Sequence, residues 1–301
     1  MPVGALKNGL ARAVRAGCGI ALAVAVGLAA APASASPPLW RVSDGDSTVW
    51  LFGTVHALQR GERNWRPAAE LTAAMAESQS FWLETEIPTE DPAASLARLG
   101  RSPGEPLSSR FAPADYARLA AVADGLGVDL ADLDELRPWL AAMTLVSASL
   151  NRGGFDQGGA DGRLLRDAAS LGLEVAGFDP ADRPLALYAG LDPAEERALL
   201  LSTVDDLAGR QPQHERLVAA WLAGDEAALE AIGLDEMRAA GEGIYDRFIT
   251  ERNAGFAARI EGLMLGRGTH FVAIGALHLV GPDRIQNALL ARGLSVERVD
   301  R

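Results

Sequence analysis

The stretch Thr48-Val49-Trp50-Leu51-Phe52-Gly53-Thr54-Val55-His56 decides the fold, because His270-Phe271-Val272-Ala273-Ile274-Gly275-Ala276-Leu277-His278 resembles it at the other end of the chain. Each copy is a short apolar run followed by Gly-x-x-His. An apolar run of this length predicts a buried strand, and the glycine lets the backbone turn sharply or approach another group closely. We therefore expect each motif histidine just past the carboxyl end of a central strand, where open α/β sheets bind ligands.

The pair of motif histidines, His56 and His278, allows two interpretations. If the two strands are neighbours, the imidazoles can converge on one metal ion. Alternatively, the strands are unrelated elements of the core, and each histidine only caps a loop. The residue pattern leaves both interpretations open.

The first 35 residues have the pattern of an export signal. Three basic residues, Lys7, Arg12 and Arg15, precede an apolar stretch over residues 17–31 and the small-residue sequence Ala33-Ser34-Ala35. This order predicts cleavage between Ala35 and Ser36, and the apolar stretch is too short for a membrane-spanning helix. We expect an exported protein, periplasmic or secreted, without a transmembrane segment in the mature chain.

The charge balance narrows the possible partners. The chain has 40 acidic and 28 basic residues and a formal net charge of −12, which becomes −15 without the signal. Such an acidic protein is not expected to bind nucleic acid or an anionic membrane surface. The predicted cleavage also removes the single cysteine, Cys18, and with it any disulfide or thiolate ligand. The net charge favours an uncharged or basic substrate, and the sequence does not indicate an oligomeric state.

Both ends of the mature chain follow the order strand, Gly-x-x-His, helix, strand. After His56 we predict a helix over about 66–77 and a strand over 80–87, and after His278 a helix around 283–292 and a strand over 295–299. We therefore predict an α/β (α+β) domain over residues 36–301. Its central mixed sheet is built from these two repeats, with a helical insertion over about 106–264, a strand near 173–178, and a surface excursion over 88–105.

A pair of glutamates follows the first repeat. In Phe81-Trp82-Leu83-Glu84-Thr85-Glu86, strand alternation places Glu84 and Glu86 on the same face. One carboxylate can bind metal while the other accepts a proton. Alternatively, the strand end emerges into water, which suits Glu86 better because Pro88 follows it.

Arg252 interrupts an apolar stripe. Phe248, Arg252, Phe256 and Ile260 recur every four residues in a helix predicted over about 235–264, with Asn253 beside them. A buried guanidinium is costly unless it is paired, so a site carboxylate or a substrate carboxylate is the expected partner. The alternative is an arginine that extends to the helix edge. Asp161, which precedes a helical run, is most simply interpreted as a helix N-cap.

These features together resemble the TraB/PrgY/GumN family, in its bacterial GumN-like branch. The resemblance rests on the two Gly-x-x-His motifs, the strand with Glu84, Arg252-Asn253, and the shorter sequences Leu39-Trp40-Arg41-Val42, Leu136-Arg137-Pro138-Trp139 and Trp221-Leu222-Ala223-Gly224-Asp225. The chain departs from the family pattern at two places. It has Gly159-Ala160-Asp161 where the resemblance predicts Gly-Val-Asp or Gly-Ile-Asp, and Gly177-Phe178-Asp179 where it predicts a glutamate at the end of a strand. These departures leave the roles of Asp161 and Asp179 undefined.

The family is similar to the Tiki metalloproteases. This similarity implies His56 and His278 as metal ligands, Glu84 as the essential carboxylate, and Arg252 and Asn253 as supporting residues. Two histidines and a carboxylate suit Mn, Co, Zn or Fe and leave room for a water. The resemblance therefore implies a metal-dependent hydrolase, most simply a peptidase, that acts on a peptide or another small molecule. In it, Glu84 or Glu86 accepts the proton. The alternatives are a non-catalytic periplasmic factor that binds a ligand or supports polysaccharide production, and a haem or iron binder on the same fold.

Overall fold

A mixed six-stranded sheet forms the centre of the fold. The computed structural model describes residues 36–60, 65–89 and 91–299, so the predicted export signal lies outside the described residues. The strand order is β6-β4-β7-β2-β1-β8. These strands are β1 (Leu39–Ser43), β2 (Ser47–Thr54), β4 (Ser80–Thr85), β6 (Glu174–Asp179), β7 (Gly268–Gly275) and β8 (Ser295–Arg298). Strands β3 (Leu58–Gln59) and β5 (Phe155–Asp156) pair separately.

The sheet is largely parallel. Strand β1 pairs antiparallel with β2 and β8, whereas β2, β7, β4 and β6 pair parallel to one another. The β1–β2 connection is a short turn around Asp44 and Gly45. The expectation of an α/β fold with a mixed central sheet is confirmed.

The helices fall into two groups along the chain. Those outside the long central segment are α1 (Ala69–Ala76), α2 (Pro92–Gly100), α14 (Glu251–Met264), the 3-10 turn η4 (Ala276–Leu279) and α15 (Ile285–Leu290). Those of the central segment are α3 (Leu107–Arg110), α4 (Pro113–Leu126), α5 (Leu130–Asp134), α6 (Pro138–Arg152), α7 (Gly159–Leu171), α8 (Arg183–Ala189), α9 (Pro193–Leu207), α10 (Gln213–Ala223), α11 (Glu226–Leu229), α12 (Glu236–Ala240) and α13 (Glu242–Tyr245), with the π-helical turns η2 (Glu230–Asp235) and η3 (Asp246–Thr250).

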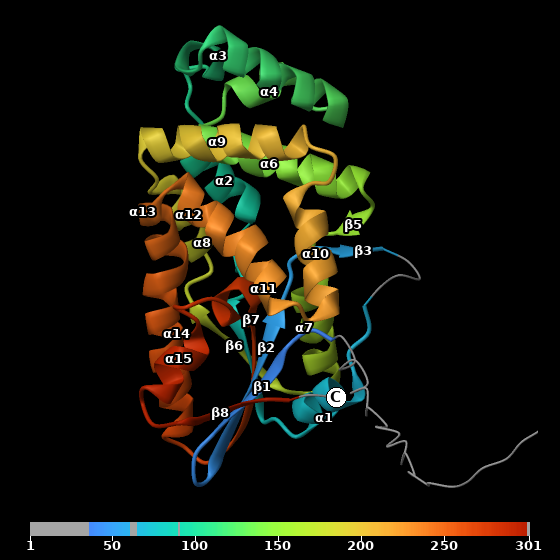
Figure 1. Cartoon of the computed structure of the whole chain (residues 1–301), viewed down its shortest axis with the longest axis vertical. Helices are drawn as coiled ribbons and strands as arrows, with labels where there is room; N and C mark the ends of the chain where they lie inside the picture. The colour runs from blue at the N-terminus through green and yellow to red at the C-terminus, as the bar shows by residue number, and fades with distance from the viewer. Residues whose placement is uncertain (1–35, 61–64, 90, 300–301) are drawn as a thin grey trace, which may run out of the picture. The chain divides into compact units, whose positions relative to one another are not determined.

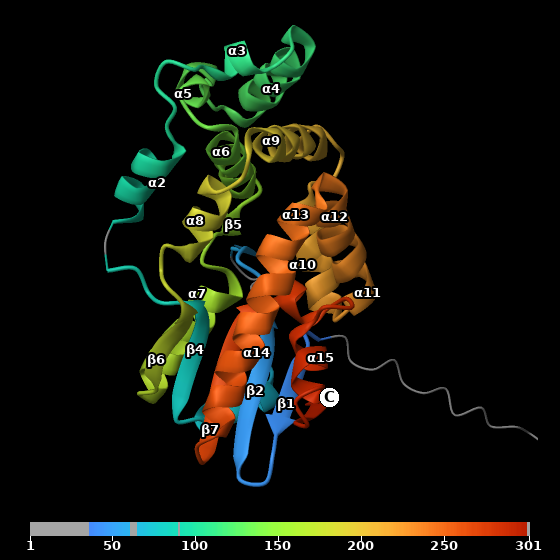
Figure 2. The ribbon, with the colours of Figure 1, turned by 90° about the vertical axis from the view of Figure 1, so that its left-hand side faces the viewer.

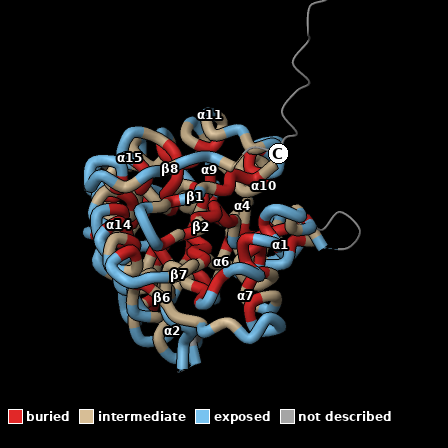
Figure 3. Tube along the Cα trace, turned by 90° about the horizontal axis from the view of Figure 1, so that it is seen from below, coloured by how far each residue is buried: buried red, intermediate tan, exposed pale blue. Residues whose placement is uncertain are grey.

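Helices cover both faces of the sheet. Side chains alternate along a strand, so Val272 of β7 packs with α14 and α15 while its neighbour Phe271 packs with α1, α7 and α10. Figures 1 and 2 show α14 and α15 on one side and α7 and α1 on the other. Figure 3 gives the view from below, in which exposed positions lie on the outer helices. Most of the buried positions of the sheet belong to its central strands β2 and β7.

The helices of the central segment gather at one end of the sheet. Figures 1 and 2 show α6, α8, α9, α10 and α12 beyond the carboxyl ends of β2 and β4. Because ligands of open α/β sheets bind at these carboxyl ends, the insertion supplies walls for a site there.

Two details differ from the sequence prediction. The excursion over 88–105 contains helix α2, for which Asp91 provides an N-cap by accepting from the backbone of Ala93. The helix predicted over 235–264 is interrupted at Gly241 and contains the π-helical turn η3 just before Arg252. Strand β6, the strand predicted near 173–178, joins the α/β core as expected, although it lies within the helical insertion.

Candidate functional site

The two Gly-x-x-His motifs lie side by side. Strands β2 and β7 pair in parallel, and Thr54 is opposite Gly275. Glycine at position 53 favours close packing of the two motifs, because a Cβ there would lie 3.2 Å from the Cα of Ala276. The carbonyl of Gly53 also accepts a hydrogen bond of 2.7 Å from the buried indole of Trp221. The sequence predicts that both histidines lie near one site if the two strands are neighbours. The pairing of β2 with β7 meets this condition.

Asp161 orients His56. Its Oδ2 lies 2.9 Å from Nδ1 of His56, and its Oδ1 accepts a hydrogen bond of 2.7 Å from the hydroxyl of Thr54. The His56 side chain is 72% exposed, whereas Asp161 is 22% exposed. The carboxylate therefore anchors one ring nitrogen, and Nε2 is the nitrogen left for a ligand.

Gly159 allows Asp161 to approach the first motif. Its φ is +54°, a left-handed conformation that glycine adopts readily. A Cβ at this position would lie only 2.1 Å from the carbonyl oxygen of Val55. The first turn of α7 is thus in direct contact with the loop that carries His56, and the backbone of Ala160 donates to the same Val55 carbonyl at 2.9 Å.

Glu84 comes from the neighbouring strand β4 and is largely buried, with 14% of its side chain exposed. Its Oε1 accepts from the backbone N–H of Gly275, and its Oε2 accepts from Nη2 of Arg252 at 3.0 Å. A Cβ at position 275 would lie 2.7 Å from Glu84 Oε1. The glycine of the second motif therefore makes room for the carboxylate.

Arg252 links the acidic and basic groups of the site. It donates through Nε to Asp179 at 3.1 Å as well as to Glu84, and its Nη1 lies 3.3 Å from Nε2 of His278. Its guanidinium also lies 4.8 Å from the centre of the Phe256 ring. Only 8% of the side chain is exposed. The expectation that this arginine pairs with a site carboxylate is confirmed.

Asn253 determines which nitrogen of His278 carries a proton. Its Nδ2 faces two carbonyl oxygens, those of Asp283 at 2.7 Å and of His278 at 3.4 Å. Carbonyls only accept, so the amide nitrogen must point to them and Oδ1 must face Nδ1 of His278 at 2.6 Å. Nδ1 is therefore protonated, and the lone pair of this buried ring is on Nε2.

Neighbouring groups separate the protonation states of these side chains. The hydrogen bond to Asp161 raises the pKa of His56 to about 9, although desolvation in the pocket acts in the opposite direction. Burial lowers the pKa of His278 to about 4, and Arg252 and His56 add to this lowering against Glu84. Burial alone would raise the pKa of Glu84, but His278, Arg252, His56 and the Gly275 N–H outweigh it and lower the pKa to about 2. Since His278 is neutral near pH 7, Arg252 and the protonated His56 are the cations that keep Glu84 ionised there.

The site lies in a pocket of about 670 Å³ between the sheet and the insertion. His56, Glu84, Asp161, Arg252 and His278 line this pocket. Asn253 lies behind His278 and is 2% exposed. Glu86 does not line the pocket: β4 ends at Thr85, and Glu86 is exposed beyond it. The structure thus brings five of the six predicted site residues together, with Glu86 outside.

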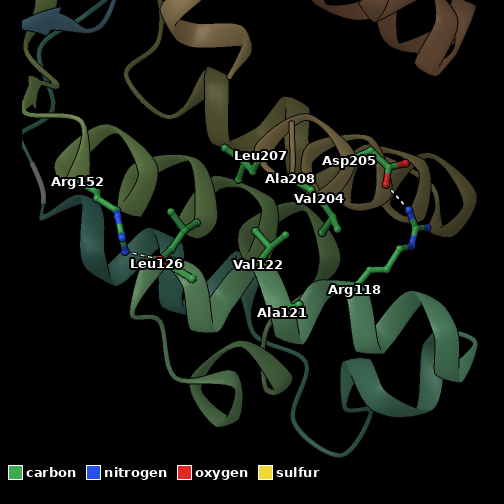
Figure 4. Close-up of a pocket in the computed structure, with 10 residues that line it drawn as sticks. Arg118, Ala121, Val122, Leu126, Arg152, Val204, Asp205, Leu207 and Ala208 are labelled. Atoms are coloured by element: carbon green, nitrogen blue, oxygen red, sulfur yellow. Dashed lines mark hydrogen bonds and ion pairs between the residues drawn. The ribbon is translucent and has the colours of Figure 1, made fainter. Parts of the chain in front are cut away.

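A second cleft, of about 410 Å³, lies between α4 and α9 and contains none of the predicted site residues. Figure 4 shows its two arginines. Arg118 pairs with Asp205, and Arg152 donates to the carbonyl of Gly125. Both guanidinium groups are therefore already engaged.

The donor chemistry of the main pocket suits a divalent transition metal. Each motif histidine has its Nδ1 tied to an oxygen, as is usual around metal-bound imidazoles, so Nε2 is the nitrogen that a metal would use. Binding there would require His56 to lose its second proton and Arg252 to move away from Nε2 of His278. Glu84 uses two of its four lone pairs and keeps two. Convergence is incomplete, however: within residues 36–60, 65–89 and 91–299, no three His, Cys, Asp or Glu side chains lie close enough together to hold a metal ion.

The sequence analysis misinterpreted one site residue, Asp161, and assigned no role to another, Asp179. Asp161 is not an N-cap, because α7 begins at Gly159 and the Asp161 carboxylate is directed to His56 and Thr54. Asp179 ends β6 and pairs with Arg252. The sequence did contain one indication of a site role for these two aspartates. Each lies two residues after a glycine, at a position where the family resemblance predicts an acidic residue.

Comparisons with known proteins give one match. The model of the TraB/PrgY/gumN family matches residues 38–298, which is most of the chain. No curated protein and no solved structure matches significantly. In the described part of the chain, no helix is long and apolar enough to cross a membrane.

Proposed function

We propose that this chain, which belongs to the TraB/PrgY/gumN family, is an exported metal-dependent hydrolase that cleaves peptide bonds. One observation carries the proposal: the two motif histidines line one pocket together with Glu84, and their Nδ1 atoms are tied to Asp161 and Asn253, so that Nε2 is the nitrogen that each ring can offer to a metal. The choice of peptide bonds rests on the similarity of the family to the Tiki metalloproteases. Export rests on the signal pattern of the first 35 residues.

His56 and His278, with Glu84, are the residues that would hold the metal, which would supply a bound water acidic enough to form hydroxide near neutral pH. The chain's own groups have separate tasks. Arg252 holds the Glu84 carboxylate ionised and can donate hydrogen bonds to a substrate carbonyl oxygen, where negative charge develops during hydrolysis. Asn253 and Asp161 fix the orientation of the two rings.

The metal content of the purified exported protein tests this proposal. We expect about one transition metal ion per chain by elemental mass spectrometry after reconstitution with Mn²⁺, Co²⁺ or Zn²⁺, and loss of the metal in the variant His56→Ala/His278→Ala. His270→Ala is the matched control, because this histidine bonds to Ser80 and does not line the pocket. Equal metal content in all three proteins would contradict the proposal.

A metal-independent hydrolase is the second candidate, and one observation favours it. Nη1 of Arg252 already lies 3.3 Å from Nε2 of His278, so the guanidinium stands where a metal would approach this nitrogen. In this candidate the His56–Asp161 pair and His278 exchange protons with water and the leaving group directly. Hydrolysis of a peptide library that persists after removal of metal by a chelator, but is lost in His56→Ala, would support it over the metal-dependent enzyme.

A further inference from the structure

Most of the pocket wall is apolar. The site residues come from the ends of the strands and from α14, whereas the remaining wall comes mainly from the helical insertion. It includes Met143 of α6, Leu187 of α8, Leu217 of α10, Met237 of α12, Phe248 of η3 and Leu277 of the second motif. The two methionines have flexible, polarisable side chains that adapt to ligands of different shape. We call the part of the wall formed by these six residues the apolar arm, and the part formed by the motif histidines and the charged side chains the polar end.

The fixed charges of the pocket are already paired. Of the described residues that line it, three are aspartate, glutamate, lysine or arginine: Glu84, Asp161 and Arg252. Glu84 pairs with Arg252, and Asp161 bonds to His56. A charged ligand group in the apolar arm would lose its hydration without gaining a partner of opposite charge. The arm therefore favours an uncharged group.

Two neutral polar side chains of the insertion also line the pocket, Tyr188 of α8 and His214 of α10. Burial lowers the pKa of His214, so that the ring is uncharged at pH 7. Its ring packs edge-on against Phe155, with the centroids 5.3 Å apart. Its Nε2 is buried and closed to solvent, so it offers no hydrogen bond to a ligand in the pocket. These two side chains therefore add no charge to the wall.

The size of the pocket also points to a substantial ligand group. A volume of about 670 Å³ is in the range of pockets that enclose most of a drug-sized molecule. A scissile peptide group at the histidines would occupy only the polar end. The remaining space accommodates a large side chain beside that bond.

We propose that the pocket selects peptides with a bulky, uncharged aliphatic or aromatic side chain next to the bond held at the histidines. This side chain lies in the apolar arm, and the peptide carbonyl lies at the Arg252 end. The inference rests on the proposed function and specifies its substrate class. Each buried methylene contributes about 0.8 kcal/mol, which corresponds to a roughly fourfold lower dissociation constant.

Binding of capped peptides tests this selectivity without requiring turnover. The probes are acetylated tetrapeptide amides, Ala-X-Ala-Ala, in which X is Gly, Leu, Phe, Lys or Glu, titrated into the full-length exported protein by NMR. We expect the Leu and Phe peptides to bind at least about tenfold more tightly than the Gly peptide. The Lys and Glu peptides should bind no better than Gly. Equal binding of all five peptides would overturn the inference.

A matched pair of variants on one helix locates the selectivity. Leu217 lines the pocket, whereas Leu222 is 40% exposed and does not. We expect the preference for Leu over Gly to fall at least about threefold in Leu217→Gln and to persist in Leu222→Gln, with folding of both verified by circular dichroism. An unchanged preference in folded Leu217→Gln would overturn the inference.

The outcomes also separate this inference from the proposed function. Selective binding of apolar peptides with no cleavage of any of them would contradict the hydrolase and support the apolar arm. Cleavage with the same efficiency for Gly, Lys and Leu peptides would contradict the apolar arm and support the hydrolase.

Discussion

Asn253 holds His278 in one tautomer through a contact of 2.6 Å between Oδ1 and the ring Nδ1. The orientation of the amide is fixed from the other side, because its nitrogen donates to the carbonyl of Asp283 at 2.7 Å. The buried amide of Asn253 therefore connects the loop before α15 with the His278 ring, and fixes which ring nitrogen faces Glu84 and Arg252. This relationship gives Asn253 a positioning role.

Replacing Asn253 with Leu should release this tautomer. We expect the wild-type ring of His278 to show a protonated Nδ1 and an unprotonated Nε2 in long-range ¹H–¹⁵N NMR spectra, assigned by comparison with His278→Ala. In Asn253→Leu the proton should redistribute between the nitrogens, and hydrolysis should slow by about 10–100-fold, the usual effect of losing such a partner. Asn151→Leu, at an exposed position near the end of α6 and outside the pocket, should change neither, and an unaltered His278 spectrum in Asn253→Leu would contradict the assignment.

Arg252 is expected to stabilise the fold as well as the site. Arg252→Met leaves Glu84 and Asp179 without their cation, and the removal of one partner from a buried ion pair costs about 3–5 kcal/mol. Urea denaturation should show this loss in the free energy of unfolding. Adding Glu84→Gln to Arg252→Met should restore part of it, because the unpaired buried charge is then removed.

Arg267→Met is the control for this loss. The Arg267 side chain is 88% exposed and pairs with Asp46 at the surface, so its replacement should change the free energy of unfolding by less than about 0.5 kcal/mol. A loss at Arg252 no larger than that at Arg267 would show that the network around Glu84 is not a buried ion pair in solution.

The strands and the motif residues could be predicted from the sequence because their signal is local. The apolar run before Gly53 predicts a buried strand by itself, and its near-copy before Gly275 predicts a second strand of the same kind. The structure adds that Thr54 faces Gly275 across a parallel ladder. One of the two sequence interpretations of Arg252 is also correct: this charge in an apolar helical stripe is paired with a site carboxylate.

The role of Asp161 could not be predicted in this way. An aspartate near a helix start satisfies the N-cap pattern on local grounds, and its actual contact with His56 spans 105 positions of sequence. The break at Gly241 and the π-helical turn η3 were also missed, because the apolar stripe of α14 continues across them with helical spacing. Contacts between distant segments, which no periodicity encodes, set these features.

Gly159 offers a test of the contact between α7 and the first motif. Gly159→Ala would place a Cβ 2.1 Å from the Val55 carbonyl in addition to the strain of a positive φ. Gly172→Ala shares the positive φ, +70°, but its Cβ meets nothing within 4 Å. We expect Gly172→Ala to cost about 1 kcal/mol and Gly159→Ala to cost clearly more, with loss of the His56–Asp161 contact. Equal unfolding free energies of the two variants would show that the motif loop yields to the methyl group.

Tyr245 should make stability depend on pH at the alkaline end. Its hydroxyl donates to Asp283 at 2.7 Å, and burial together with this bond raises its pKa to about 12 from the ordinary 10. Because the unfolded chain loses the phenolic proton first, the stabilisation is fully present below pH 10 and is lost as the pH rises through 12. The shift of two units corresponds to at most about 3 kcal/mol.

The free energy of unfolding of the wild type should therefore fall relative to that of Tyr245→Phe between pH 10 and pH 12, as measured by urea denaturation. An ultraviolet titration should show the corresponding phenolate step near pH 12 in the wild type and not in Tyr245→Phe. Parallel stability curves for the two proteins over this range would mean that the Tyr245 hydroxyl has the same pKa in the folded and the unfolded chain. The hydrogen bond to Asp283, which also positions the loop before α15, would then not be formed in solution.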